Sequence, residues 1–327
     1  MIGALDIALD PAGASPWRLA AAGGGMGATW AVGRPAEEVA GLMPLVFNLC
    51  GAAHAQASRQ ALALPPEAAG AAALARQERL RDHALAILSD WPSLLGQMPD
   101  HAALRGLATA EAPLWLRRHL LGRDLDLAGC TLGELDRWLA AAPSPTACGL
   151  ADLRARVDPA WGRAELPAPA AADIAAALDA GAPTVPRETT AADEWRAVPL
   201  LRDLHAREGA SLFLRMLARL LDLLACLDPA PCAPPQALPP AGPGIGLARA
   251  ARGVLAHRAR VAGGLVTDYR VLSPSAWNLA PDGLLARMLA ALPLNDQTPM
   301  LARLVISCVN PCVKVTLRLG AREKAHA

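Results

Sequence analysis

An amphipathic helical period runs through most of this 327-residue sequence. In residues 67–89, Leu74, Leu80, Leu85 and Leu88 recur at helical spacing with arginine or glutamate between them. Such spacing predicts a helix with one apolar face. Similar patterns occupy residues 112–121, 131–141, 193–227 and 281–292. The period therefore predicts a mainly helical protein.

The period changes after a stretch rich in proline and glycine. Residues 229–243 hold seven prolines, and glycines extend the stretch to 246. Proline breaks regular elements, so we expect 229–246 to be a loop or linker within a single domain spanning 1–327. Residues 253–272 alternate in character around Gly263-Gly264, which predicts a β-hairpin. With a last apolar segment at 300–319, the expected class is α+β, mainly α with a small β-hairpin or sheet.

Charge and hydropathy exclude several classes of partner. The 31 basic and 30 acidic side chains give a net charge of +1, whereas nucleic-acid grooves and anionic membranes recruit a large basic excess. Two stretches, 39–58 and 229–248, lack charged residues, but proline or polar residues interrupt both, so no membrane span is expected. The opening MIGALDIALD carries Asp6 and Asp10 where a signal peptide needs an unbroken apolar run. We therefore expect a cytoplasmic protein.

The cysteines restrict the kinds of metal site. There are seven, an odd number without an export signal, which predicts reduced thiols. No two are spaced as CxxC, so a zinc ribbon and a thioredoxin-type pair are excluded. Any metal must take its ligands from segments far apart in the chain.

Three separate segments carry candidate chemistry, and each has a structural alternative. Cys50 and His54 are four residues apart, which places both on one face of a helix and suits a soft metal or an activated nucleophile. Taken alone, this segment favours the structural alternative, a buried cysteine and a capped histidine in an alanine-rich helix. In the second segment, Arg252 and His257 alone would be solvated strand residues, and 274–278 a loop. In the third, the two cysteines of SCVNPCVKV alone would be buried at the end of a strand or helix.

Taken together and in order, the three segments resemble the large subunit of nickel-iron hydrogenases. That family has a CGxCxxxH element, a hairpin of the kind EAPRGxLxH leading to Tyr and PTxWN, and a closing DPCxxC. The hairpin matches best, and the other two elements match at Cys50, His54 and Asn310-Pro311-Cys312. The hairpin matches are Arg252, Gly253, Leu255, His257, Tyr269 and 274–278. The resemblance implies a truncated large-subunit-like fold.

Several positions depart from the family pattern. Phe47 and Val315 stand where the first and the last cysteine are expected, so a four-thiolate nickel site cannot form and no nickel is expected. Asn310 replaces the aspartate of the closing element. Arg249, Ala251 and Arg318 replace an acidic residue and a proline of the hairpin element and the histidine at which the family's precursor is cleaved. We therefore expect a protein that is not an enzyme.

A shortened, uncleaved relative of this kind is similar to the HupK-type, or HoxV, hydrogenase expression and formation proteins. The resemblance implies a maturation scaffold that transiently holds iron with cyanide and carbonyl ligands before transfer to the large-subunit precursor. It implies Cys50 and Cys312 as ligands, Cys308 as a further candidate, and Arg252, His54 and His257 around the cargo. It also implies a small HypC-type chaperone as partner. The alternative is a metal-free paralogue that binds maturation partners through an inherited fold.

Overall fold

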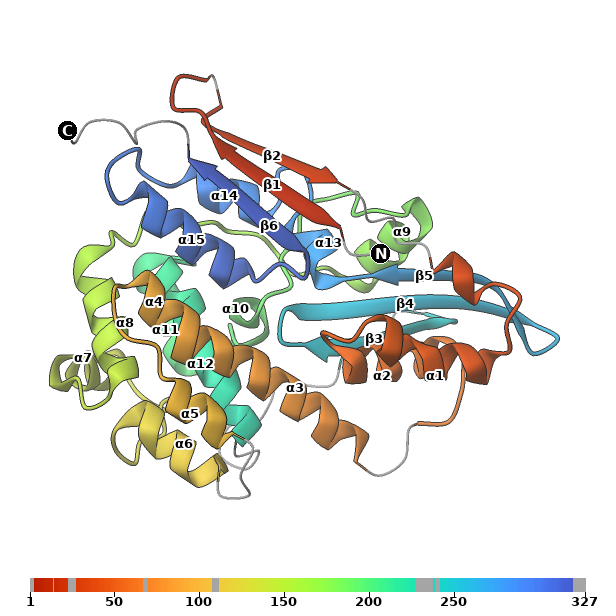
Figure 1. Ribbon diagram of the computed structural model, residues 1–327, viewed down its shortest axis with the longest axis horizontal. Coiled ribbons are helices and arrows are strands. Elements are labelled where there is room, and N and C mark those ends of the chain that lie inside the picture. The colour runs from red at the N-terminus through yellow and green to blue at the C-terminus, as the bar shows by residue number, and fades with distance from the viewer. Residues whose placement is uncertain are drawn as a thin grey trace.

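The computed structural model shows many helices packed around two small sheets (Figure 1). The structure describes residues 3–13, 15–22, 28–66, 70–107, 112–227, 238 and 242–319. The strands are β1 (Ala4–Leu9), β2 (Trp17–Ala22), β3 (Ile245–Ala250), β4 (Gly253–Ala262), β5 (Leu265–Leu272) and β6 (Lys314–Leu319). The larger helices are α1 (Ala36–Val46), α2 (Gly51–Ala61), α3 (Ala71–Leu85), α6 (Ala112–Leu121), α7 (Leu132–Ala141), α8 (Pro145–Arg156), α9 (Ala171–Ala180), α11 (Pro199–Glu208), α12 (Leu212–Leu227) and α15 (Thr298–Val309). Shorter helices are α4 (Trp91–Leu94), α5 (His101–Gly106), α10 (Ala191–Glu194), α13 (Pro274–Asn278) and α14 (Leu284–Ala290).

Helix α12 is the centre of the helical part. Every one of its residues is buried, including Arg215, Arg219 and Asp222, and α3 and α15 pack alongside it. The single long helix expected over 193–227 is wrong, because the segment forms α10, α11 and α12. Pro199 occupies the first position of α11, and Gly209 ends that helix at a φ of +72°. A proline is tolerated at a helix start, and a glycine readily adopts positive φ at a helix end.

A π-helical turn joins α3 to α4. It spans Ala86–Asp90, so that α3, the turn and α4 form one helical rod along α12. Wider turns of this kind change which residues share a face. Asp82 and Trp91, nine positions apart, both reach Arg219 of α12: the ion pair is 3.3 Å long, and the guanidinium lies 5.7 Å from the indole centroid.

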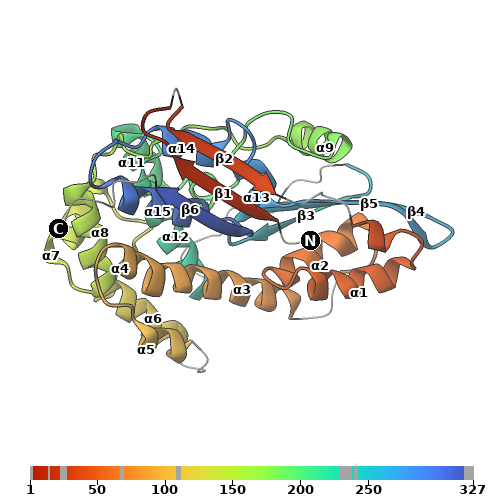
Figure 2. The same ribbon diagram turned by 45° about the horizontal axis from the view of Figure 1, so that its top comes forward.

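The predicted hairpin is confirmed and belongs to a three-stranded antiparallel sheet, β3-β4-β5. Gly263 and Gly264 turn between β4 and β5 with φ of +59° and +79°, the left-handed values of a two-residue hairpin turn. Helix α2 packs on one face and α9 on the other (Figure 2). A Cβ at Gly246 would lie 2.0 Å from the Ala57 carbonyl oxygen, so glycine permits the close contact between β3 and α2. The expected loop thus ends earlier than predicted, at β3, and residues 229–237 and 239–241 lie outside the described residues.

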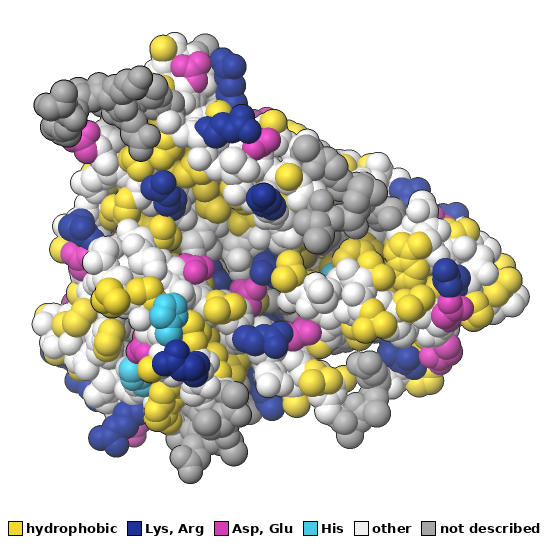
Figure 3. Space-filling view, in the orientation of Figure 1, with side chains coloured by type: hydrophobic (Ala, Val, Ile, Leu, Met, Phe, Trp, Pro, Cys, Tyr) yellow, Lys and Arg dark blue, Asp and Glu magenta, His cyan; other side chains and the backbone are white. Residues whose placement is uncertain are grey.

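A second sheet, β2-β1-β6, was not predicted. Strand β1 pairs antiparallel with β2 and parallel with β6, which joins the two ends of the chain over α14 and α15 (Figure 1). The apolar segment 300–319 accordingly divides into α15 and β6. Among the described residues, no helix has the length and apolar character needed to cross a membrane. On the face shown in Figure 3, basic and acidic side chains are interspersed rather than gathered by sign.

Candidate functional site

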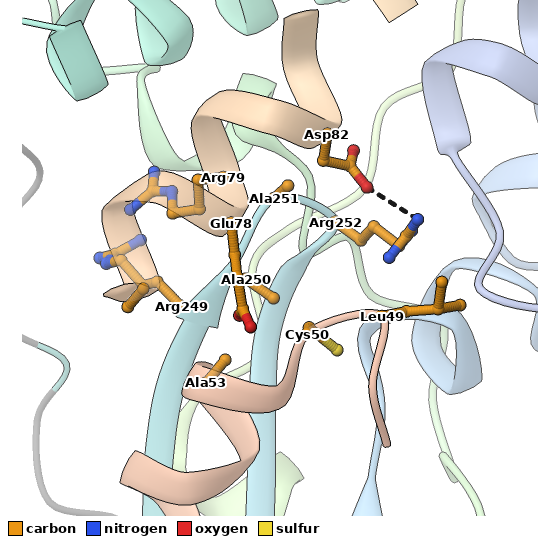
Figure 4. A pocket seen from close by; sticks show the side chains of 11 residues that line it. Leu49, Cys50, Ala53, Glu78, Arg79, Asp82, Arg249, Ala250, Ala251 and Arg252 are labelled. Atoms are coloured by element: carbon orange, nitrogen blue, oxygen red, sulfur yellow. Dashed lines mark ion pairs between the residues drawn. The ribbon is translucent and has the colours of Figure 1, made fainter. Parts of the chain in front are cut away.

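A small pocket lies where three of the fold's segments meet. Cys50 and Leu49 precede α2, Arg252 lies in the turn between β3 and β4, and Glu78 and Asp82 project from α3 (Figure 4). The remaining lining residues are Ala53, Ala75, Arg79, Arg249, Ala250 and Ala251. Segments separated by about 200 residues thus supply one thiol, three guanidinium groups and two carboxylates to one space.

Cys50 is the N-cap residue of α2, and its surroundings favour the protonated thiol. Burial raises the pKa of Cys50 to about 12, although the Arg252 charge opposes this shift. The negative charges of Cys312, Glu78 and Asp82 raise this pKa further, so Cys312 lies close enough to act on Cys50. Both oxygens of Glu78 accept from the Ala52 amide at 3.0 Å. This carboxylate therefore satisfies one of the N–H groups that lack a partner within the first turn of α2.

Arg252 is largely buried and is not the solvated strand residue that the alternative interpretation expected. Its Nη2 pairs with Asp82 Oδ2 at 2.7 Å (Figure 4), while its buried Nε has no hydrogen-bond partner in the described part of the chain. Gly253, which follows it, has φ +122°, and a Cβ there would lie 1.2 Å from the Thr189 carbonyl oxygen. Glycine at 253 is therefore a packing requirement, because only glycine lets this turn approach Thr189 so closely.

The Cys312 segment is held by two other elements. The Cys312 amide donates to Ser275 Oγ at 2.9 Å, at the start of α13. Asn310 caps α15 in the left-handed conformation, with φ +51°, and its Nδ2 donates to Asp82 Oδ1 at 2.6 Å. Residues 274–278 form α13 and not the loop that the alternative interpretation expected, because Ser273 caps the helix and Pro274 occupies its first position.

Cys308 lies in a different environment. It is buried within the main apolar core on α15, and burial raises its pKa to about 11, although Arg219 and Arg215 oppose this shift. Cys308 does not line the pocket.

The two predicted histidines lie behind the pocket. The four-residue spacing of Cys50 and His54 predicted that both share one helix face. Cys50 lines the pocket, however, whereas the His54 ring stacks on Phe47 with their centroids 4.3 Å apart. His54 Nδ1 lies 2.9 Å from His257 Nε2, and His257 Nδ1 lies 2.7 Å from the Tyr269 hydroxyl. Burial lowers the pKa of His54 to about 3 and that of His257 well below its usual value. Both rings are neutral at physiological pH, and His257, fully buried, is not a solvated strand residue.

No group of three or more His, Cys, Asp or Glu side chains within the described ranges is arranged to hold a metal ion. The two residues that replace cysteines of the hydrogenase pattern, Phe47 and Val315, have structural contacts instead. Phe47 covers His54, and Val315 pairs with Leu5 between β6 and β1.

The residues that sequence reasoning missed all lie in helices. Glu78, Arg79 and Asp82 belong to the amphipathic pattern of α3, and Arg219 belongs to the leucine-rich α12. The sequence carried no clear signal for this network, because the burial of Arg219 in α12 shows only in the structure; charged residues are almost never fully buried unless paired.

Comparison with solved structures defines the class of this fold. An NAD+-reducing [NiFe]-hydrogenase matches 90% of this chain and 92% of its own, with a TM-score of 0.54 at 16% identity. The Ni-Fe-Se hydrogenase from D. vulgaris Hildenborough matches with a TM-score of 0.52 at 15% identity. The family model described as nickel-dependent hydrogenase matches residues 200–314. The predicted mainly helical, truncated large-subunit-like fold is thereby confirmed.

Relatives identify the family more closely. The chain is 38% identical over 300 residues to the hydrogenase expression/formation protein HupK of Rhodobacter capsulatus, covering 90% of this chain and 89% of the relative. It is 31% identical to HupK of Azotobacter vinelandii and 28% identical to HoxV of Cupriavidus necator, in each case over 88% of this chain and 89% of the relative. The chain belongs to the HupK family of hydrogenase expression/formation proteins, as its motifs indicated.

Proposed function

We propose that this protein is a maturation scaffold for nickel-iron hydrogenase. It holds an iron carrying cyanide and carbonyl ligands as cargo before the iron passes to the large-subunit precursor. One observation carries the proposal: the fold brings Cys312 close enough to Cys50, 262 positions away, for its charge to raise the Cys50 pKa, and Asp82 joins Arg252 beside Cys50 to Asn310 of the Cys312 segment. The names of the relatives support the role in hydrogenase formation.

The donor set fits such cargo. Strong-field diatomic ligands leave few iron positions for the protein, so two thiolates suffice. A guanidinium N–H is a good donor to an anionic cyanide, and the buried Nε of Arg252 has no hydrogen-bond partner in the described part of the chain. His54, His257, Cys308 and Cys312 all lie outside the pocket lining. We keep Cys312 as a ligand because its charge acts on Cys50, and we assign the histidines a supporting role beneath Cys50.

The ligand count argues against nickel and against hydrogenase catalysis in this chain. A four-thiolate site needs cysteines where Phe47 and Val315 stand. The site therefore favours an accessory role.

The partners follow from the need to exchange the cargo. We propose that a HypC-type chaperone delivers the iron and that the large-subunit precursor receives it. Leu49 lines the pocket and is 57% exposed, and Leu45 and Val46 nearby are also exposed, so an apolar surface adjoins the pocket. Phe47 and Val315, which stand where the hydrogenase pattern has cysteine, do not line the pocket.

The test is metal analysis and infrared spectroscopy of protein purified without oxygen from cells that assemble hydrogenase. We expect iron with bands in the cyanide and carbonyl stretching region, both absent in Cys50→Ala and Cys312→Ala. Cys148→Ser, an exposed cysteine outside the site, is the matched control and should keep the iron. A Cys312→Ala variant that retains iron and supports full hydrogenase activity would contradict the scaffold.

Wild-type protein that binds the chaperone but carries no iron would favour the metal-free accessory protein. The absence of a three-residue ligand cluster in the described ranges is the observation that keeps this second function in view.

A further inference from the structure

Arg219, a residue outside the three motif segments identified in the sequence, makes four contacts with three other elements. Its Nη1 donates to the Ser307 carbonyl oxygen of α15 at 2.7 Å, and its Nη2 pairs with Asp82 of α3 at 3.3 Å. Its Nε donates to His83 Nδ1 at 3.3 Å, and its guanidinium lies over the Trp91 ring. The side chain is 5% exposed, so these contacts replace water almost completely.

His83 fixes the orientation of this guanidinium. Burial lowers the pKa of His83, although Asp222 opposes the shift, so the ring is neutral. Because Nδ1 accepts from Arg219, Nε2 carries the proton and donates to Asp222 Oδ2 at 2.5 Å. Both ring nitrogens are thereby satisfied, and His83 holds Arg219 between the two helices.

Asp82 connects Arg219 to both halves of the site, the Arg252 turn and the Cys312 segment. One oxygen pairs with Arg252 at 2.7 Å, and the other accepts from Asn310 at 2.6 Å. Arg252 lies beside Cys50, and Asn310 precedes Cys312 by two residues. A continuous set of contacts therefore leads from α12 to both thiols.

We propose that Arg219 is a positioning residue: through Asp82 and α15 it sets the placement of the Cys312 segment relative to Cys50 and Arg252. The inference rests on the proposed function only for its biological meaning, because the placement of the two thiols can be measured without iron.

Arg215 provides a matched control. It lies one turn earlier in α12, is 2% exposed, and pairs with Glu188 instead of Asp82. Replacing either arginine by lysine keeps the charge but removes the fork of donors, so both variants carry a similar general cost to the core.

The experiment is crosslinking of the full-length, iron-free protein with dibromobimane, which joins two neighbouring thiols, with the products mapped by peptide mass spectrometry. We expect a Cys50–Cys312 crosslink in the wild type, a several-fold lower yield in Arg219→Lys, and a wild-type yield in Arg215→Lys. Melting temperatures and far-UV circular dichroism establish that each variant is folded.

Asn310→Gly is the second variant, in case Arg219→Lys does not fold. Glycine keeps the left-handed backbone and removes only the amide that reaches Asp82, so the crosslink should again fall several-fold. The inference is overturned if the wild type gives no crosslink, if folded Arg219→Lys or Asn310→Gly gives the wild-type yield, or if Arg215→Lys loses the crosslink equally. A wild type that crosslinks but never carries iron leaves the positioning role intact and removes the proposed function.

Discussion

The two sides of the Cys50 pocket are built from opposite kinds of polar group. Towards the sheet, α2 and β4-β5 bury a chain of neutral groups, His54, His257 and Tyr269. Towards the helices, α3 and α12 bury charged groups. These are Arg79, Asp82, Arg219 and Asp222, with the neutral His83 between them. The histidines on both sides are neutral because burial lowers their pKa values. Among the described residues, no carboxylate opposes this shift at His54 or His257, whereas Asp222 opposes it at His83.

The difference teaches what each side can tolerate. A buried neutral group that loses one hydrogen bond costs about 1 kcal/mol to a few kcal/mol, whereas a buried charge left without its partner costs about 3 to 5 kcal/mol. On the charged side, removing any one member should therefore destabilise the protein strongly, because its partners are left buried and unpaired.

Asp222→Ala should have the largest effect. Asp222 accepts from Arg79, from His83 and, at 2.9 Å, from Trp195 Nε1. Its removal leaves the His83 and Trp195 N–H groups without this acceptor and leaves the buried Arg79 guanidinium with Glu194 as its remaining carboxylate, at 3.3 Å. We expect the free energy of unfolding, measured by urea denaturation, to fall by about 3 to 5 kcal/mol.

The isosteric Asp222→Asn is the control, since it keeps an acceptor oxygen and the shape and should cost less than Asp222→Ala. If Asp222→Ala costs no more than a single lost hydrogen bond on the neutral side, the distinction between the two sides is wrong.

Glu194→Gln should have a smaller effect that depends on pH. Burial raises the pKa of Glu194 from 4.5 to about 7, although Arg79 opposes the shift. Between these values the folded protein holds a proton that the unfolded chain has lost, so stability falls as pH rises through this window. Wild type should lose on the order of 3 kcal/mol from this group, and Glu194→Gln should not.

Urea denaturation at a series of pH values measures this difference. Glu165 supplies a control of opposite sign: burial raises its pKa, but hydrogen bonds from His205 and Ala210 outweigh burial and lower it. Glu165→Gln should therefore remove a contribution that is present above about pH 4.5 and lost towards acid. Equal pH dependence in the two variants would show that Glu194 is not proton-bound at neutral pH.

Sequence predicted the local parts of the fold and missed the parts made by distant pairing. The hairpin was predictable because Gly263-Gly264 specifies a two-residue turn within the chain. Strand β1 was not, because its parallel partner β6 lies about 310 residues away, and alanine-rich strands such as WRLAAA carry weak β-propensity. The break of 193–227 at Pro199 and Gly209 was readable but was outweighed by the leucine pattern.

The same limit applies to the site. Cys50, Arg252 and Cys312 were found because they stand in recognisable segments. Asp82 and Arg219 were not, because on an amphipathic helix a paired buried charge and a solvated charge look alike in one sequence. Only the packing of α3 on α12 distinguishes them.

Tyr269→Phe should have the smallest effect and tests the neutral side. It removes the hydroxyl that lies 2.7 Å from His257 Nδ1 and leaves that buried nitrogen without its partner, so we expect a loss of about 1 kcal/mol. Burial raises the pKa of Tyr269, and both histidines are neutral above their lowered pKa values. None of these three groups therefore titrates between about pH 7 and pH 9. The loss should be the same throughout that range. Ser58→Ala removes a second buried hydroxyl of the neutral side, which donates to the Ala55 carbonyl oxygen and also interacts with the Tyr269 hydroxyl, so its cost should likewise be independent of pH in that range. A Tyr269→Phe loss that grows towards pH 9 would mean that one of the groups on the neutral side is ionised. The contrast between a neutral and a charged side of the pocket would then fail.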